Sequence, residues 1–178
     1  MHFEMKHVFD APVDQVLDAM FAPELPEYLK AHMKSIREIK PLERKDDGAT
    51  VTRRVRYVPT PIISSVGPKK IPPEALAFVE ESTFDRKAKQ ITFKNVAEHD
   101  RVRKHLENGG TFTFKDLGGG KTERIAAGEL KVGNLSFFLR PLGLIAEQII
   151  YSNAQKLLNE EAKVFAEFLK QRTAAPAA

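Results

Sequence analysis

The sequence LSFFLRPLGLI, residues 135–145, opens the part of the chain that decides its fold. From there to Arg172, apolar residues recur every three or four positions, which is the spacing of one face of an α-helix. The recurring residues are Leu142, Ile145, Ile149, Ile150, Ala154, Leu157, Val164, Phe165, Phe168 and Leu169. A helix from Leu142 to Arg172 would be roughly 45 Å long at 1.5 Å per residue. Because one small partner cannot bury such a helix, a broad surface must wrap it.

The preceding residues predict an antiparallel sheet as that surface. Residues 3–9 alternate apolar and polar positions, as a half-buried strand does. Short helices are expected over 13–21 and 24–32, the second with Pro26 in its first turn. Six further strands form three hairpins, over 35–45 and 50–58, 75–84 and 90–98, and 108–116 and 122–132. A twisted antiparallel sheet of this kind can curl around one helix.

Two segments lie outside this pattern. Residues 59–73 contain five prolines and are expected to form a loop, because proline cannot donate to a strand ladder. A loop of that length is usually functional or mobile. Residues 99–107 indicate no element. We expect one domain over 1–172 and a disordered tail over 173–178.

Composition limits the classes of function. The chain has 178 residues, a net charge of +4 and no cysteine, so disulfide and thiolate chemistry are excluded. It has neither an apolar secretion segment at its start nor a run of about 18 apolar residues, and we expect a cytoplasmic protein. The charge is interspersed, so nucleic acid is not an expected partner, although an anionic membrane surface is compatible with it. The five histidines lack ligand spacing, so neither a metal nor a cofactor is expected.

The order of strand, two short helices, six strands and long helix resembles the helix-grip arrangement of the START-like superfamily, which includes the birch-pollen allergen fold. The resemblance rests on Phe9-Asp10-Ala11-Pro12-Val13-Asp14-Gln15-Val16, and on Ala22-Pro23 followed by Tyr28. It implies an α+β fold with a curved seven-stranded antiparallel sheet around the C-terminal helix. It also implies a deep apolar cavity between sheet and helix, which in members binds lipids, sterols, polyketides or quinones.

Alternation along the strands assigns a set of apolar residues to the face expected to line this cavity. They are Phe3, Met5, Phe9, Val51, Val55, Tyr57, Leu76, Phe78, Ile91, Phe93, Phe112 and Phe114. The same face and the helix stripe carry His7, Arg53, Asn95 and Asn153. From these we predict ligand contacts at His7, Arg53, Val55, Tyr57, Phe78, Phe93, Asn95, Phe112, Phe114, Ile149 and Asn153. The alternative is a solid core packed against the helix.

The polar members of this set admit several roles. A buried arginine needs an anionic partner, so Arg53 would hold an anionic head group of a ligand or pair internally with Glu80 or Glu38. In a third alternative the strand register points Arg53 to solvent. His7, Tyr57 or Arg53 would polarise a carbonyl in an enzyme, whereas His7 would otherwise be a hydrogen-bonded core residue. Carboxylates such as Glu80-Glu81 and Glu160-Glu161 are expected on solvated faces.

A gate is predicted where the proline-rich loop and the start of the long helix carry apolar residues beside basic ones. Its residues are Ile62, Ile63, Val66, Lys69, Lys70, Phe137, Phe138, Leu139, Arg140 and Leu142. The alternative is that this run plugs one end of the sheet. Three functions follow: binding of a lipid or other hydrophobic small molecule with intermembrane transfer, a polyketide cyclase or aromatase, and a chaperone-type or ribosome-associated interaction module. No catalytic residue is assigned, and binding without catalysis is preferred.

Overall fold

The computed structural model describes residues 1–60, 65–66, 69–70, 73–133 and 140–174. In chain order the elements are β1 (His2–Phe9), α1 (Val13–Met20), α2 (Leu25–His32), β2 (Ile36–Asp46), β3 (Thr50–Pro59), β4 (Ser65–Val66), β5 (Lys69–Lys70), the 3-10 helix η1 (Pro73–Leu76), β6 (Phe78–Asp85), β7 (Gln90–Ala97), α3 (Asp100–Arg103), β8 (Leu106–Gly118), β9 (Lys121–Val132) and α4 (Arg140–Ala174). None of the helices in the described part has the length and apolarity of a membrane span.

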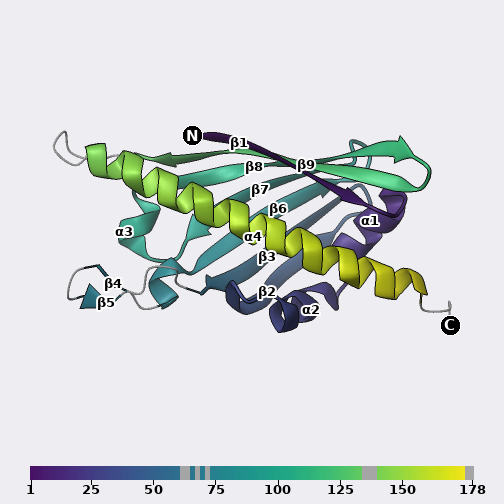
Figure 1. Ribbon diagram of the computed structural model, residues 1–178. Coiled ribbons are helices and arrows are strands. Elements are labelled where there is room, and N and C mark those ends of the chain that lie inside the picture. Colours follow the sequence, from purple (N-terminus) through teal and green to yellow (C-terminus); the bar gives the residue numbers. More distant parts are fainter. Residues whose placement is uncertain (61–64, 67–68, 71–72, 134–139, 175–178) are drawn as a thin grey trace.

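Seven strands form one antiparallel sheet in the order β1-β9-β8-β7-β6-β3-β2. Helix α4 runs diagonally across one face of this sheet, with α1 and α2 beside its C-terminal half (Figure 1). We call the face toward α4 the inner face. This arrangement confirms the predicted helix-grip fold, with its curved sheet, long C-terminal helix and two short helices after the first strand.

The hairpins arise where the sequence supplies turn chemistry. Between β2 and β3 the Asp47 carboxylate accepts hydrogen bonds from the backbone N–H groups of Ala49 and Thr50. Gly48 occupies a φ of +87°, which is readily accessible to glycine. The predicted Asp-Asp-Gly turn therefore forms as the sequence indicates.

The structure corrects two boundaries. The strand predicted to start at Ala75 begins at Phe78, because Pro73–Leu76 forms a 3-10 helix. Leu76 is consequently exposed, and its assignment to the inner face is wrong. Helix α4 continues to Ala174, two residues beyond the predicted end at Arg172.

The two segments without a predicted element contain short ones. The proline-rich segment was predicted to be a loop, but it contains the short antiparallel strand pair β4–β5. Residues 99–107 contribute α3 and the first residues of β8.

The most completely buried part of the core lies where α1, α2 and the C-terminal half of α4 meet the sheet. Phe165 of α4 is fully buried and packs edge-on against Phe9 of β1, with ring centroids 5.1 Å apart. Val16 of α1 is also fully buried. Glu160 fixes the same half of α4 to the start of β2, since its carboxylate accepts the backbone N–H groups of Lys34 and Ser35 at 2.7 and 3.2 Å.

Candidate functional site

Burial along α4 divides the helix into two halves. Its C-terminal half buries Ala162, Phe165, Phe168 and Leu169. Among the described side chains from Glu147 to Glu161, none is buried, including those on the stripe that faces the sheet. The N-terminal half therefore packs less closely against the sheet than the C-terminal half does.

Opposite that loosely packed half, the strand register brings together a group of half-buried side chains. Tyr57 of β3 pairs with Phe78 of β6, and Glu80 of β6 pairs with Asn95 of β7. Tyr57 and Phe78 stack with ring centroids 5.3 Å apart. Since direct cross-strand partners project to the same side of a sheet, these side chains share the inner face.

The other predicted ligand contacts lie around this group. Phe93 and Phe112 stack at 4.8 Å and are buried, as is Val55. Phe114 and Asn153 are half-buried. Ile149 lies in α4, but its side chain is outside the described part of the structure.

Arg53 is held by other residues of the protein. Its Nη2 lies 3.3 Å from Glu80, its Nε donates to the Ser82 hydroxyl at 3.0 Å, and its Nη1 donates to the Met20 carbonyl at 3.1 Å. The guanidinium also lies 5.0 Å from the centre of the Phe21 ring. The internal pair with Glu80 is therefore formed, and the expectation that Glu80 is solvated is wrong.

Arg124 of β9 forms a second internal pair that the sequence did not indicate. Its side chain is 1% exposed and binds Glu161 of α4 through two contacts, of 3.0 and 2.6 Å. The guanidinium lies 5.2 Å from the centre of the Phe9 ring and 5.3 Å from that of Phe112. Glu161 is only 18% exposed, so its assignment to a solvated face is also wrong.

His7 occupies a hydrogen-bonded position beside this pair. Arg124 Nη2 lies 3.4 Å from His7 Nδ1, and His7 Nε2 lies 3.0 Å from Asn159 Oδ1. Because arginine can only donate, Nδ1 accepts, and the ring proton on Nε2 is donated to the Asn159 oxygen. Both ring nitrogens are thus engaged within the protein.

The Nε of Arg124 is buried without a hydrogen-bond partner among the described residues. Two further polar groups, in the loosely packed region, also lack such a partner. Burial and the nearby Glu80 carboxylate raise the pKa of Tyr57 well above its usual range, so its phenol stays neutral. Its hydroxyl has no hydrogen-bond partner among the described residues. Asn95 Oδ1 is buried and likewise lacks a partner in the described part of the chain.

The predicted gate residues cannot all be placed. Ile62, Ile63, Phe137, Phe138 and Leu139 lie outside the described residues. Val66, Lys69 and Lys70 belong to β4–β5, while Arg140 and Leu142 belong to the first turn of α4. These two segments lie toward the same end of the molecule, on the left in Figure 1.

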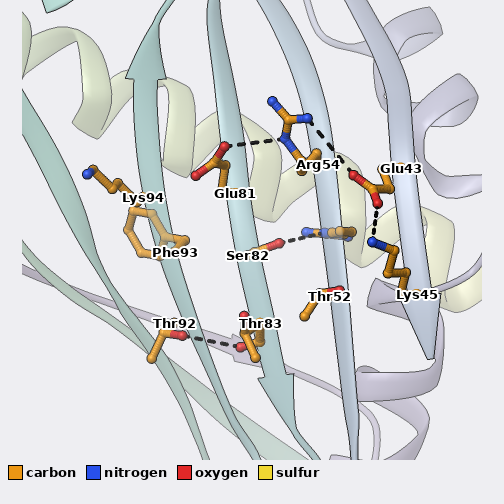
Figure 2. Close-up of a pocket in the computed structure, with 11 residues that line it drawn as sticks. Glu43, Lys45, Thr52, Arg54, Glu81, Ser82, Thr83, Thr92, Phe93 and Lys94 are labelled. Carbon is orange, nitrogen blue, oxygen red and sulfur yellow. Dashed lines mark hydrogen bonds and ion pairs between the residues drawn. The ribbon is translucent and has the colours of Figure 1, made fainter. Parts of the chain in front are cut away.

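A separate hollow of about 500 Å³ lies on the outer face of the sheet, which is turned away from α4 (Figure 2). Outward-facing residues of β2, β3, β6 and β7 line it, including Thr52, Thr83 and Thr92. Its rim carries ion pairs across the strands, such as Arg54 with Glu81 at 3.3 Å. Sequence reasoning did not identify this hollow.

No protein-family model and no curated protein sequence matches the chain. Several solved structures, in contrast, are similar to it. The Zhui aromatase/cyclase from a Streptomyces species has a TM-score of 0.67 at 11% identity, covering 100% of this chain and 98% of that one. The Thermus thermophilus protein TTHA0849 has a TM-score of 0.66 at 17% identity, covering 98% and 100%.

A norcoclaurine synthase from Thalictrum flavum, solved with a transition-state analogue, has a TM-score of 0.66 at 12% identity, covering 98% of this chain and 96% of that one. At these identities the similarity establishes the fold and leaves the activity open. The chain therefore shares the helix-grip fold of these structures.

Proposed function

We propose that the protein binds a hydrophobic small molecule between the inner face of the sheet and the N-terminal half of α4. The observation that carries this proposal is the difference in burial between the two halves of α4. A solid core would bury the inner stripe of the whole helix, yet the first buried side chain among those described in α4 is Ala162. Apolar ligand surface placed there would contribute roughly 2.5 kcal/mol for each 100 Å² removed from water, before the costs of association.

The stacked aromatic pairs support this location. Tyr57 with Phe78, and Phe93 with Phe112, present ring surface on the inner face, with Asn95 between them along the sheet. Pockets for small molecules are typically apolar and aromatic with a few fixed polar groups. The structurally similar aromatase/cyclase and norcoclaurine synthase agree with a hydrophobic ligand in such a fold.

Binding can be tested with a tryptophan placed in the site, because the chain contains no tryptophan. A Phe78→Trp variant provides one emission signal next to the proposed ligand. Hydrophobic probes should quench or shift it, whereas a Val8→Trp control on the outer side of β1 should not respond. Native mass spectra of the unmodified protein, with organic extraction, should reveal a retained ligand. Absence of both a bound ligand and a probe response would disprove the proposal.

Transfer between membranes is an extension of this function. The end of the molecule that carries Lys69, Lys70 and Arg140 would meet an anionic bilayer, since basic residues are attracted to anionic lipid. A fluorescent lipid should then move faster between anionic vesicles than between neutral ones. Replacing both lysines with glutamate should remove that difference while leaving binding in solution unchanged.

A cyclase-type enzyme is the second candidate, and the Tyr57 hydroxyl favours it because it lies on the inner face without a hydrogen-bond partner among the described residues. A phenol that stays protonated in an apolar site can donate a hydrogen bond to a substrate carbonyl. His7 is less suited to that task because both its ring nitrogens are engaged. Tyr57→Phe should then abolish turnover of a polyketide-like substrate and change its affinity little, whereas a simple binding protein would show no turnover.

A further inference from the structure

The charges on the inner face are balanced within the protein. Arg53 is paired with Glu80, and Arg124 is paired with Glu161. An anionic head group near Arg53 would have to compete with Glu80 and would leave that carboxylate, 16% exposed, without its partner. The inner face is therefore poorly suited to a charged ligand, contrary to the anionic head group that Arg53 suggested from the sequence.

In contrast to these paired charges, the side chain of Asn95 has a buried hydrogen-bond acceptor without a donor. Its Oδ1 has no partner among the described residues, although buried polar atoms are nearly always hydrogen-bonded. The register places Asn95 directly between Glu80 of β6 and Asn108 of β8, on the inner face of the sheet. A ligand that donates a hydrogen bond here would remove a desolvation cost that the free protein bears.

Tyr57 lies on the same face, two strands from Asn95 and level with Ala97, two residues further along β7. Its hydroxyl can donate or accept, and the described residues give it no partner. The ring of Phe78, stacked on Tyr57, supplies apolar surface beside it.

We propose that the ligand is an uncharged apolar molecule with a hydroxyl or phenol group that donates a hydrogen bond to Asn95 Oδ1, with the Tyr57 hydroxyl as a second polar contact. This inference rests on the proposed binding function and specifies the chemical class of its ligand. It requires no charge on the ligand and no rearrangement of the two internal ion pairs.

Three probes of matched shape test the class: para-butylphenol, para-butylanisole and para-butylbenzoate. Their affinities for the unmodified protein are measured by titration calorimetry. The phenol should bind roughly tenfold more tightly than the anisole, as one hydrogen bond of ordinary net strength provides. The benzoate should bind most weakly of the three. An anisole that matches the phenol, or a benzoate that exceeds it, would overturn the inference even if binding itself is established.

Variants locate the hydrogen bond. Asn95→Leu keeps the approximate volume and should abolish the preference for phenol over anisole, while anisole affinity is kept. Thr92→Val, on the outer side of the same strand, is the control and should preserve the preference. A preference that survives Asn95→Leu would refute the role of Asn95. If none of the three probes binds the unmodified protein, this inference fails, whereas the proposed function fails only if native mass spectra and the tryptophan variant also show no ligand.

Discussion

Replacing Glu161 with leucine removes the carboxylate that holds Arg124 between β9 and α4. Arg124 is 1% exposed, so its guanidinium cannot regain water without opening the fold. Breaking a buried ion pair from one side costs about 3–5 kcal/mol, because the remaining charge is left uncompensated. We expect Glu161→Leu to lower the free energy of unfolding by about 4 kcal/mol.

The reverse change should cost less. In Arg124→Met, the remaining carboxylate of Glu161 is 18% exposed and can reach water. The methionine can also keep favourable contacts with the rings of Phe9 and Phe112. We expect a loss of about 2 kcal/mol, within the range for one unsatisfied buried group.

The double variant, Arg124→Met with Glu161→Leu, removes both charges and should unfold within about 1 kcal/mol of the unmodified protein. The two losses are then strongly non-additive, with a coupling of roughly 5 kcal/mol or more. Urea unfolding followed by far-ultraviolet circular dichroism measures all four members of the cycle. Additive losses, or a Glu161→Leu variant milder than Arg124→Met, would refute the assignment of Arg124 as a buried and compensated charge.

Three further changes test other parts of the structure. Gly128→Ala should destabilise the protein by about 1–3 kcal/mol in urea unfolding, since an added Cβ would clash with the backbone carbonyl oxygen of Gly109 and lie 2.7 Å from the Phe3 ring. Glu160→Gln should lower the melting temperature, because it weakens charge-assisted hydrogen bonds worth about 1.5–3 kcal/mol each to the start of β2. The hydrogen bond from Arg86 holds the pKa of Asp46 below its usual range, so Asp46 contributes stability above about pH 4 that is lost as the pH falls. The stability difference between the unmodified protein and Asp46→Asn should therefore shrink below that pH.

Matched controls separate these effects from general sensitivity. An added Cβ at Gly133 meets only the end of the Lys131 side chain at 3.9 Å, so Gly133→Ala should be nearly neutral. Glu167 makes a surface contact with Lys170 one turn away, and Glu167→Gln should change the melting temperature little. Equal effects of a control and its test variant would contradict the corresponding explanation.

The strands and helices were predictable because their signals are local. Alternation placed Phe3, Val51 and Phe93 on the inner face, and all three are buried there. The prediction that Leu76 lies on the inner face was wrong because Leu76 belongs to η1, which begins at Pro73 and ends before β6 begins. The alternation of apolar and polar residues predicts the face of the sheet correctly only for residues that belong to the strand.

The polar interior was less predictable because its partners are distant in the sequence. Arg124 and Glu161 are separated by 37 residues, and each resembles an ordinary surface charge in its own segment. The ion pair between Glu80 and Arg53 was hard to predict for the same reason, since only the pairing of β3 with β6 brings the two residues together. The contacts of Asn95 likewise depend on register across three strands, which no local pattern contains.

The two halves of α4 also differ in what substitution would cost. Changes at Phe165 or Phe168 would remove fully packed surface, and a marginally stable protein tolerates few such losses. Changes between Ile150 and Leu158 would alter side chains that are not buried, so many should leave the folded state intact. Selection or laboratory evolution could therefore change this part of the helix, and with it the preference for the proposed ligand, while the rest of the scaffold keeps its sequence.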